Sequence, residues 1–496
     1  MEKRVLVAFG LSLSVLLLWS AFFVKPTPKI TPVQPKEQIV LPSESKMEEQ
    51  PSLITARFDG MDIVFVEKQA AIREIIFPAY KNGKFILKNA FLMADNENNF
   101  HVGQITPESI DFISETPDKK ITKRFLYKSN YNIYLDLIIE NKIKQPFKIN
   151  PTLLLGTLNF SSSQPQPHYA EITASLVEKT IHPNPKKDGI YNQLKFMGLK
   201  DRYFCLIIEP AMEGYSGFVK KISSNESEAG ISNKEIMVLP SETITQQFKV
   251  YLGPQDFKVL AHNNPAWAAV IYYGSLDLIA QMLSQLLYFL HNIFKNWGLT
   301  LIGFSILVYF LLYPLTLKQI RSMKEMQSLQ PKIEQLRVTY KDNPQRMNKE
   351  IFELYKTHKV NPYSGCLPLL LQIPIFFALY QVLIRSVALK GAHFLWIKDL
   401  SEPDRLITFS NSPIPFITEL NLLPILMVIA TFIQQKYSNT NSSAISNEQQ
   451  KIFSIIFPIM FGFIFYKMPS GLVLYWFVNN LLMLASQMNL HRKNAA

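Results

Sequence analysis

Residues 297–317 read WGLTLIGFSILVYFLLYPLTL and contain no charged side chain. About 20 helical residues, each rising about 1.5 Å, are enough to cross a hydrocarbon core of about 30 Å. Lys318 follows directly and begins a stretch rich in Lys and Arg that reaches Asn361. An apolar run that ends at a basic segment is typical of a membrane span with a cytoplasmic loop. We therefore expect a membrane-spanning helix over residues 297–317.

Other apolar runs bring the number of predicted spans to six. They lie in residues 1–24, 367–384, 420–433, 452–466 and 472–488. The first run follows Lys3 and Arg4 and lacks a small-residue cleavage site, so we interpret it as an uncleaved anchor whose N-terminus stays in the cytoplasm; a signal peptide is the alternative. Residues 491–496 would then form a cytoplasmic tail.

The region between the first two spans differs in composition from the rest of the chain. Residues 25–53 are rich in Pro and polar side chains, which indicates an extended spacer. Residues 54–265 contain short apolar or alternating runs, such as 131–139, bounded by Gly, Pro and Asn, a pattern that predicts an exported β-sandwich domain. Its His and Gly residues have no catalytic or metal-binding spacing, so we interpret it as a scaffold or docking domain. Residues 266–296 suit an amphipathic helix in the membrane interface.

The overall composition excludes several classes of protein. Of 496 residues, 48% are hydrophobic and only 18% charged, which is too apolar for a disordered chain. Two cysteines, Cys205 and Cys366, cannot form a disulfide framework or a Cys-based zinc site. We find no motif for a nucleophile, a nucleotide or a metal, and therefore expect neither enzymatic activity nor a cofactor. The net charge of +12 allows a nucleic-acid binder, but we attribute most of it to membrane topology and expect no sequence-specific nucleic-acid binding.

Residues 318–361 hold the most concentrated positive charge, with ten Lys or Arg against five Asp or Glu. Apolar residues recur at spacings of three and four on both sides of the helix breaker Asp342-Asn343-Pro344, from Met323 to Leu336 and from Met347 to Tyr355. This pattern predicts two amphipathic helices in an αα-hairpin. One interpretation is a loop whose charge only fixes topology. The other, which we favour, is a surface that contacts an acidic or RNA-bearing partner through Lys318, Arg321, Lys324, Lys332, Arg337, Arg346, Lys349, Lys356 and Lys359.

Five stretches in fixed order carry a family resemblance. They are YPLT at 313–316, LQPKI at 329–333, YK at 355–356 with VNP at 360–362, GCLPLLLQIPIF at 365–376 and PSGLVLYW at 469–476. With these stretches the chain resembles the YidC membrane protein insertase family, in its Gram-negative inner-membrane form. The resemblance implies an α-helical polytopic membrane protein with six transmembrane helices, a five-helix insertase core at 297–490 and a large periplasmic all-β sandwich domain.

The same resemblance implies function and partners. It implies an insertase and chaperone in the bacterial inner membrane that takes nascent membrane proteins as substrates, alone or with the Sec translocon (SecYEG and SecDF). The ribosome or the signal recognition particle receptor would contact the hairpin and the tail, and membrane lipids would surround the spans. Alternatives are a transporter of a small solute or lipid, and a non-catalytic assembly scaffold.

The resemblance further implies a polar groove that opens to the cytoplasm and to lipid and is closed outward. Candidate lining residues are Ser305, Tyr309, Gln372, Gln434, Tyr475, Trp476 and Asn479, together with Asn480. Each could instead bond helices together or belong to an interfacial aromatic belt. The family usually carries an Arg at the position of Tyr309, so we expect this groove to attract acidic substrate segments less strongly.

Overall fold

A computed structural model of the chain describes residues 52–93, 99–160, 170–358, 367–409, 419–439 and 458–495. The predicted span at 1–24, nearly all of the spacer and the hairpin residue Lys359 lie outside these ranges. The chain divides into two compact units, Met1–Ser275 and Leu276–Ala496.

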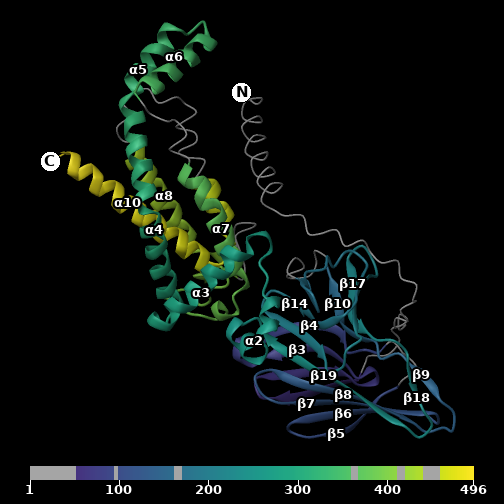
Figure 1. The fold of residues 1–496 in the computed structure, drawn as a ribbon. Helices are drawn as coiled ribbons and strands as arrows, with labels where there is room; N and C mark the ends of the chain where they lie inside the picture. The colour runs from purple at the N-terminus through teal and green to yellow at the C-terminus, as the bar shows by residue number, and fades with distance from the viewer. Residues whose placement is uncertain are drawn as a thin grey trace. The chain divides into compact units, whose positions relative to one another are not determined.

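The first unit is built from antiparallel strands (Figure 1). They are β1 (Leu53–Phe58), β2 (Met61–Val66), β3 (Ala71–Phe77), β4 (Gly83–Ala90), β5 (His101–Ile105), β6 (Ser109–Glu115), β7 (Lys119–Tyr127), β8 (Asn132–Asn141), β9 (Phe147–Ile149), β10 (Leu153–Asn159), β11 (Glu171–Leu176), β12 (Thr180–Ile181), β13 (Gly189–Tyr191), β14 (Leu194–Lys200), β15 (Phe204–Pro210), β16 (Ser216–Lys221), β17 (Glu226–Ser232), β18 (Ile236–Val238) and β19 (Thr243–Pro254).

These strands form one large and several small sheets. The large sheet has nine strands in the order β12-β11-β14-β15-β19-β8-β7-β6-β5. Two four-stranded sheets have the orders β1-β2-β3-β4 and β10-β17-β16-β13, and β18 pairs with β9. In β8 the apolar side chains of Ile133, Leu135, Leu137 and Ile139 alternate into the core, as the sequence pattern predicted.

Aromatic rings join the faces of two sheets. The Phe65 ring on β2 lies 5.0 Å from the rings of both Phe112 and Phe125 on the large sheet. Phe77 on β3 stacks on Phe204 of β15 at 4.2 Å. Full burial of each such side chain contributes roughly 2 kcal/mol. Face-to-face packing of this kind defines a β-sandwich.

One lysine is buried within this sandwich. Lys123 on β7 has no exposed surface, and its ammonium group donates hydrogen bonds to the carbonyls of Gln69 (3.2 Å), Ala70 (3.2 Å) and Phe91 (2.8 Å). The ring of Phe100 lies 4.8 Å from the same nitrogen. All three N–H donors of the charged form therefore have acceptors.

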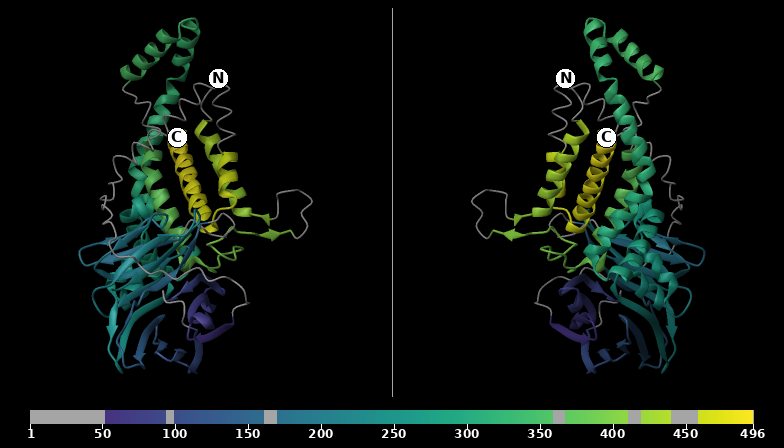
Figure 2. Two further views of the ribbon diagram at one scale, coloured as in Figure 1. Left: turned by 90° about the vertical axis from the view of Figure 1, so that its right-hand side faces the viewer. Right: turned by 90° about the vertical axis from the view of Figure 1, so that its left-hand side faces the viewer.

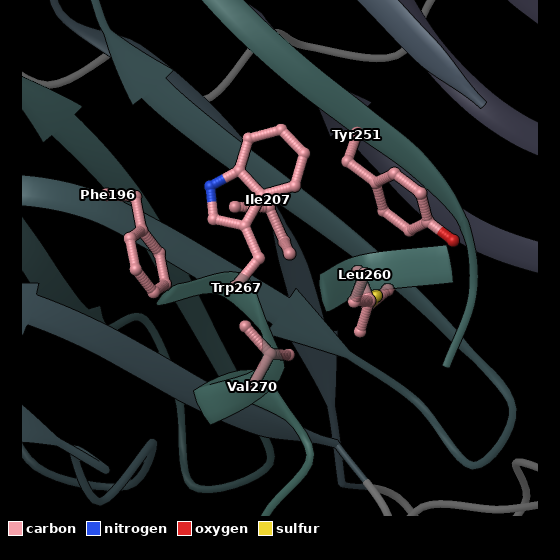
Figure 3. Packing of buried hydrophobic residues seen from close by; sticks show 7 residues of the cluster. Phe196, Ile207, Tyr251, Leu260, Trp267 and Val270 are labelled. Carbon is pink, nitrogen blue, oxygen red and sulfur yellow. The ribbon is translucent and has the colours of Figure 1, made fainter. Parts of the chain in front are cut away.

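The first unit continues past the end predicted for its β-domain at residue 265. Helix α2 (Phe257–Asn263) and the 3₁₀ helix η3 (Pro265–Val270) follow β19. Trp267 and Val270 are fully buried in one cluster with Phe196 and Tyr251, and the Trp267 ring lies in the centre of the cluster (Figure 3). The Trp267 indole donates to Glu209 at 2.7 Å. This packing explains why residues 266–270 belong to the sandwich rather than to an interfacial helix.

The second unit is mainly helical. Its elements are α3 (Asp277–Phe294), α4 (Trp297–Ser328), α5 (Gln330–Thr339), α6 (Pro344–Thr357), α7 (Leu367–Arg385), η5 (Val387–Leu389), β20 (Ile407–Thr408), β21 (Glu419–Leu420), α8 (Leu422–Asn439) and α10 (Ser470–Ala495), and residues 458–465 are also helical. Of the remaining 3₁₀ helices, η1 (Glu67–Gln69) and η2 (Pro78–Tyr80) belong to the first unit, and η4 (Gly274–Leu276) spans the boundary between the units.

Among the described residues, two helical segments are long and apolar enough to cross a membrane, Trp297–Pro314 and Ser470–Asn489. Gln372–Arg385 and Leu422–Gln435 are shorter apolar helices. The number of six spans therefore stays a prediction. Helix α10 also continues through most of the residues predicted as a tail.

Helix α10 packs against both α8 and α4 (Figure 2). Its Asn480 contacts Thr431 of α8, and three residues later Met483 contacts Gln434. Tyr475 lies beside Phe304 of α4, and further along, Ser486 contacts Tyr309. Contacts that advance in the same direction on both partners mean that α4, α8 and α10 run parallel.

The hairpin differs from the prediction in where its first helix begins. Helix α4 continues from the predicted span through Pro314 to Ser328, and the chain breaks at Leu329 before α5. Pro331 explains the break, because proline favours the first turn of a new helix. Leu329 and Ile333 are buried against Ile351, Leu354 and Tyr355 of α6. The predicted pairing of two apolar stripes is therefore present between α5 and α6.

Candidate functional site

Polar side chains join α4 to α10 within an apolar environment. The Tyr309 hydroxyl donates to the Ser486 hydroxyl at 2.6 Å, and Tyr309 is only 8% exposed. Ser305 is fully buried one turn earlier, but its hydroxyl donates to the Leu301 carbonyl of its own helix at 2.7 Å. The four-residue spacing places Ser305 and Tyr309 on one helix face, as predicted.

A second set of polar contacts joins α8 to α10. The Asn480 amide donates to the Thr431 hydroxyl at 2.7 Å, and that hydroxyl donates to the Met427 carbonyl at 2.8 Å. The Gln434 amide approaches the Met483 sulfur at 2.6 Å. Because α10 bonds to α4 on one side and α8 on the other, it forms the centre of this polar region.

Three further candidates lie close together at α7 and α10. The Tyr475 hydroxyl is buried near the side chains of Gln372 and Asn479, although it meets the geometry of a hydrogen bond with neither. The Asn479 amide donates to the Tyr475 carbonyl at 2.9 Å. The structure thus brings Gln372, Tyr475 and Asn479 together across two helices.

Trp476 has different surroundings. Its ring lies 5.1 Å from Phe376, 5.6 Å from Phe461 and 5.4 Å from Phe465. These aromatic contacts pack Trp476 of α10 against α7 and the helix at 458–465. A groove-lining role for Trp476 stays a prediction.

Several buried oxygens in this unit have no hydrogen-bond partner among the described residues. In the helices they are the side-chain oxygens of Gln381, Gln435, Tyr475 and Gln487, and in the loop before α8 it is the Oδ1 oxygen of Asp404. Buried polar atoms of this kind are normally satisfied by water. These oxygens could therefore accept hydrogen bonds from water or from a polar group of a bound molecule.

Sequence reasoning missed Ser486, Thr431 and Gln487. Ser486 could have been found from its spacing, since it lies seven residues, or about two helical turns, after Asn479. Thr431 gave no signal of its own, because a threonine within an apolar helix commonly bonds the preceding turn.

The basic residues of the hairpin surround its apolar contact. Lys332, Arg346, Lys349 and Lys356 are exposed, and Arg337 is half-buried. Lys332 lies 3.1 Å from a ring nitrogen of His358, and the Arg346 guanidinium lies 5.2 Å from the centre of the Tyr340 ring. Side-chain positions are not described for Lys318, Arg321 and Lys324. The charge of the described residues faces solvent, where a partner could reach it.

No group of His, Cys, Asp or Glu that could hold a metal ion occurs within the described ranges.

Comparison with known proteins gives two family matches. The family described as "60Kd inner membrane protein" matches residues 289–496, and the family described as "YidC periplasmic domain" matches residues 94–286. A membrane protein insertase YidC of Syntrophobacter fumaroxidans is 35% identical over 397 residues, which cover 77% of this chain and 70% of the relative. A membrane protein insertase YidC of Pelobacter propionicus is 30% identical over 559 residues, with 99% of both chains covered.

Among solved structures, a crystal structure of an active YidC insertase with its first transmembrane domain resolved is 21% identical. The match covers 98% of this chain and 99% of that chain, with a TM-score of 0.43.

Proposed function

Because this chain belongs to the YidC family of membrane protein insertases, we propose that it inserts nascent membrane proteins through a polar groove between α4, α8 and α10. The family is not enzymatic and acts in the bacterial inner membrane, and its role favours insertion over solute transport or a purely scaffolding role.

The observation that carries the proposal is the set of hydrogen-bonded pairs inside otherwise apolar helices. Tyr309 with Ser486 and Thr431 with Asn480 lie on opposite sides of α10. Moving an unpaired polar group from water into hydrocarbon costs roughly 2–7 kcal/mol. Exchangeable hydroxyl and amide groups, with the unpaired oxygens nearby, would lower this cost for a substrate before its apolar segment partitions into lipid. A catalyst of this kind lowers a barrier and needs no ATP.

We further propose six spans, with both termini in the cytoplasm and the β-sandwich in the periplasm. The parallel course of α4, α8 and α10 supports this topology, because parallel helices in one membrane must be separated by helices of opposite direction. Residues 367–384 and 452–466 would supply them. The exposed apolar side chains of Leu278, Met282 and Phe289 on α3 support a position for this helix in the membrane interface.

Partners are proposed from the same arrangement. The exposed basic residues of the hairpin would contact the ribosome or the signal recognition particle receptor, and lipids would surround the spans. Cooperation with SecYEG and SecDF on larger substrates is carried over from the family resemblance.

Reconstitution tests the groove. We expect the purified chain in liposomes to insert a short two-span substrate, measured as protease protection of the substrate. Replacing Asn480 and Tyr309 with Leu should lower insertion while the protein stays folded, since both changes remove polar groups and keep an apolar helix. The matched control is Phe310→Leu, which changes an exposed apolar side chain of the same helix and should leave insertion unchanged. If the substrate were protected from protease equally well in liposomes without the protein, insertion activity would be refuted.

The chemistry at position 309 can be tested separately. Tyr309→Phe removes the hydroxyl that bonds Ser486, whereas Tyr309→Arg adds a positive charge. We expect Tyr309→Phe to reduce insertion and Tyr309→Arg to favour substrates with acidic translocated segments, measured as relative protection of acidic and neutral versions of one substrate. Equal activity of wild type, Phe, Leu and Arg variants would remove this position from the mechanism.

A further inference from the structure

A short segment, residues 394–405, contacts the start of each parallel helix; we call it the clamp segment. Asp404 within it is only 3% exposed. Its carboxylate accepts a hydrogen bond from the Leu423 amide at 2.6 Å and one from the Trp396 indole at 3.3 Å. Leu423 is the second residue of α8, where backbone amides lack partners within the helix. A side chain from another segment thus fixes the start of α8.

The clamp segment holds the start of α10 through its backbone. The Ser470 amide donates to the Glu402 carbonyl at 2.8 Å, and the Gly471 amide donates to the Leu400 carbonyl at 2.9 Å. A Cβ at position 471 would lie 3.1 Å from that same carbonyl oxygen, so glycine permits the close approach. The first two residues of α10 are therefore tied to the clamp segment.

Contacts with α4 and with residue 466 complete the arrangement. A Cβ on Gly298, in the first turn of α4, would overlap the Phe394 ring, so the ring packs directly on the helix backbone. Asn421 is fully buried, accepts from the Arg405 amide at 2.9 Å and donates to the Tyr466 carbonyl at 2.7 Å. All three parallel helices thus begin on one segment.

Farther along, the three helices are joined by contacts of another kind. Among the described residues, the polar contacts there are side-chain pairs such as Tyr309 with Ser486 and Gln434 with Met483. Among the described residues, the helix starts are therefore held by backbone and buried carboxylate bonds, whereas the middle parts of the helices are joined by exchangeable side-chain bonds.

We propose that Asp404 is a positioning residue that keeps the outward end of the groove closed while a substrate separates the cytoplasmic ends of the helices. This inference rests on the proposed function and topology, which place the starts of α4, α8 and α10 outward. Loss of the Asp404 carboxylate would free the start of α8 and admit water from the periplasmic side.

Cysteine labelling tests the clamp in full-length protein. In proteoliposomes, Ser305→Cys would be introduced into a C205S/C366S background and treated with a membrane-impermeant maleimide from either side. With Asp404→Ala, outward labelling should rise by about tenfold or more, the shift expected from losing a hydrogen bond to a charged group. Labelling of Ser486→Cys from the cytoplasmic side should not change.

Two variants control for general loosening. Asp404→Asn keeps an oxygen that can accept from the Leu423 amide and should label at nearly the wild-type rate. Glu402→Gln changes a carboxylate of the same segment whose side chain is 38% exposed and pairs with Arg405 at 3.4 Å, and it should have no effect. Should Asp404→Ala fail to assemble, Trp396→Phe removes one donor to the carboxylate and should give a smaller outward increase.

Several results would overturn the clamp. One is unchanged outward labelling in the assembled Asp404→Ala or Trp396→Phe protein. Another is a rise in labelling that is equal from both sides of the membrane. The third is an Asp404→Asn protein that is labelled from the outward side as fast as Asp404→Ala. The proposed function fails by a different readout, the absence of substrate protection with wild-type protein, so the two failures are distinguishable.

Discussion

At the residue scale, Lys123 shows what a single side chain contributes to the periplasmic sandwich. Complete burial lowers its pKa to about 7, while three carbonyls hold the charged form in place. Because the ordinary pKa is near 10.5, the unfolded chain binds more protons than the folded one between about pH 7 and 10. Stability of the first unit should therefore rise with pH across that window.

Lys123→Met tests this assignment. The variant leaves three carbonyls without their donor, and we expect a loss of roughly 3 kcal/mol of unfolding free energy at neutral pH. The pH dependence between about 7 and 10 should also become flatter. Both effects can be measured on the full chain by thermal unfolding and by the protection of backbone amides in the large sheet against hydrogen exchange. Lys128→Met, at an exposed position just after β7, is the matched control, and equal losses in both variants would contradict a special role for Lys123.

At the element scale, the α5–α6 hairpin separates a structural face from a charged face. The contact between Leu329, Ile333 and Ile351 holds the helices together, while the described Lys and Arg side chains lie outside it. Charge can thus be changed without removing the apolar contact.

Replacing Lys332, Arg346, Lys349 and Lys356 with Glu should reduce binding to ribosomes that carry a nascent membrane protein by about tenfold or more at low salt, because ribosomal RNA is strongly anionic. Cosedimentation across a salt series measures this loss. Glu353→Gln, which removes an exposed negative charge on the same helix, should not weaken binding. Unchanged binding in the fourfold variant would leave the hairpin charge with a topological role alone.

The sequence predicted some of these features and could not predict others. Apolar length predicted the helices around residues 297–317 and 472–488, and three-and-four spacing predicted the α5–α6 contact. The order of the nine-stranded sheet was not predictable, because β19 pairs with β15 and with β8, strands remote in sequence. The bond between Asp404 and Leu423 likewise depends on how a loop folds back, which no local pattern reveals.

At the scale of the whole molecule, the division at Ser275 separates the sandwich from the helical unit. Trp267 and Val270 belong to the sandwich core, so a deletion that ends near residue 250 would leave apolar residues of that core exposed. A cut at the unit boundary avoids this.

Deleting residues 53–275 should leave most of the insertion activity intact if the helical unit carries the groove. Liposome insertion of the two-span substrate measures it, with the full chain at equal protein density as the reference. Loss of all insertion by a deletion variant that is still membrane-integrated would assign an essential role to the sandwich.

The parallel course of α4, α8 and α10 also has an electrical consequence. Each helix carries roughly half a positive elementary charge at its N-terminus and half a negative one at its C-terminus, and parallel dipoles add. In the low dielectric of the membrane their summed field is weakly screened. The Asp404 carboxylate offsets part of the positive end. Under the proposed topology, α7 runs in the opposite direction and offsets part of this field, and the negative ends of α4, α8 and α10 face the cytoplasm. A negatively charged segment would therefore be drawn toward the three helix starts only once it lies within the groove, although α4 has no basic side chain between Trp297 and Thr316.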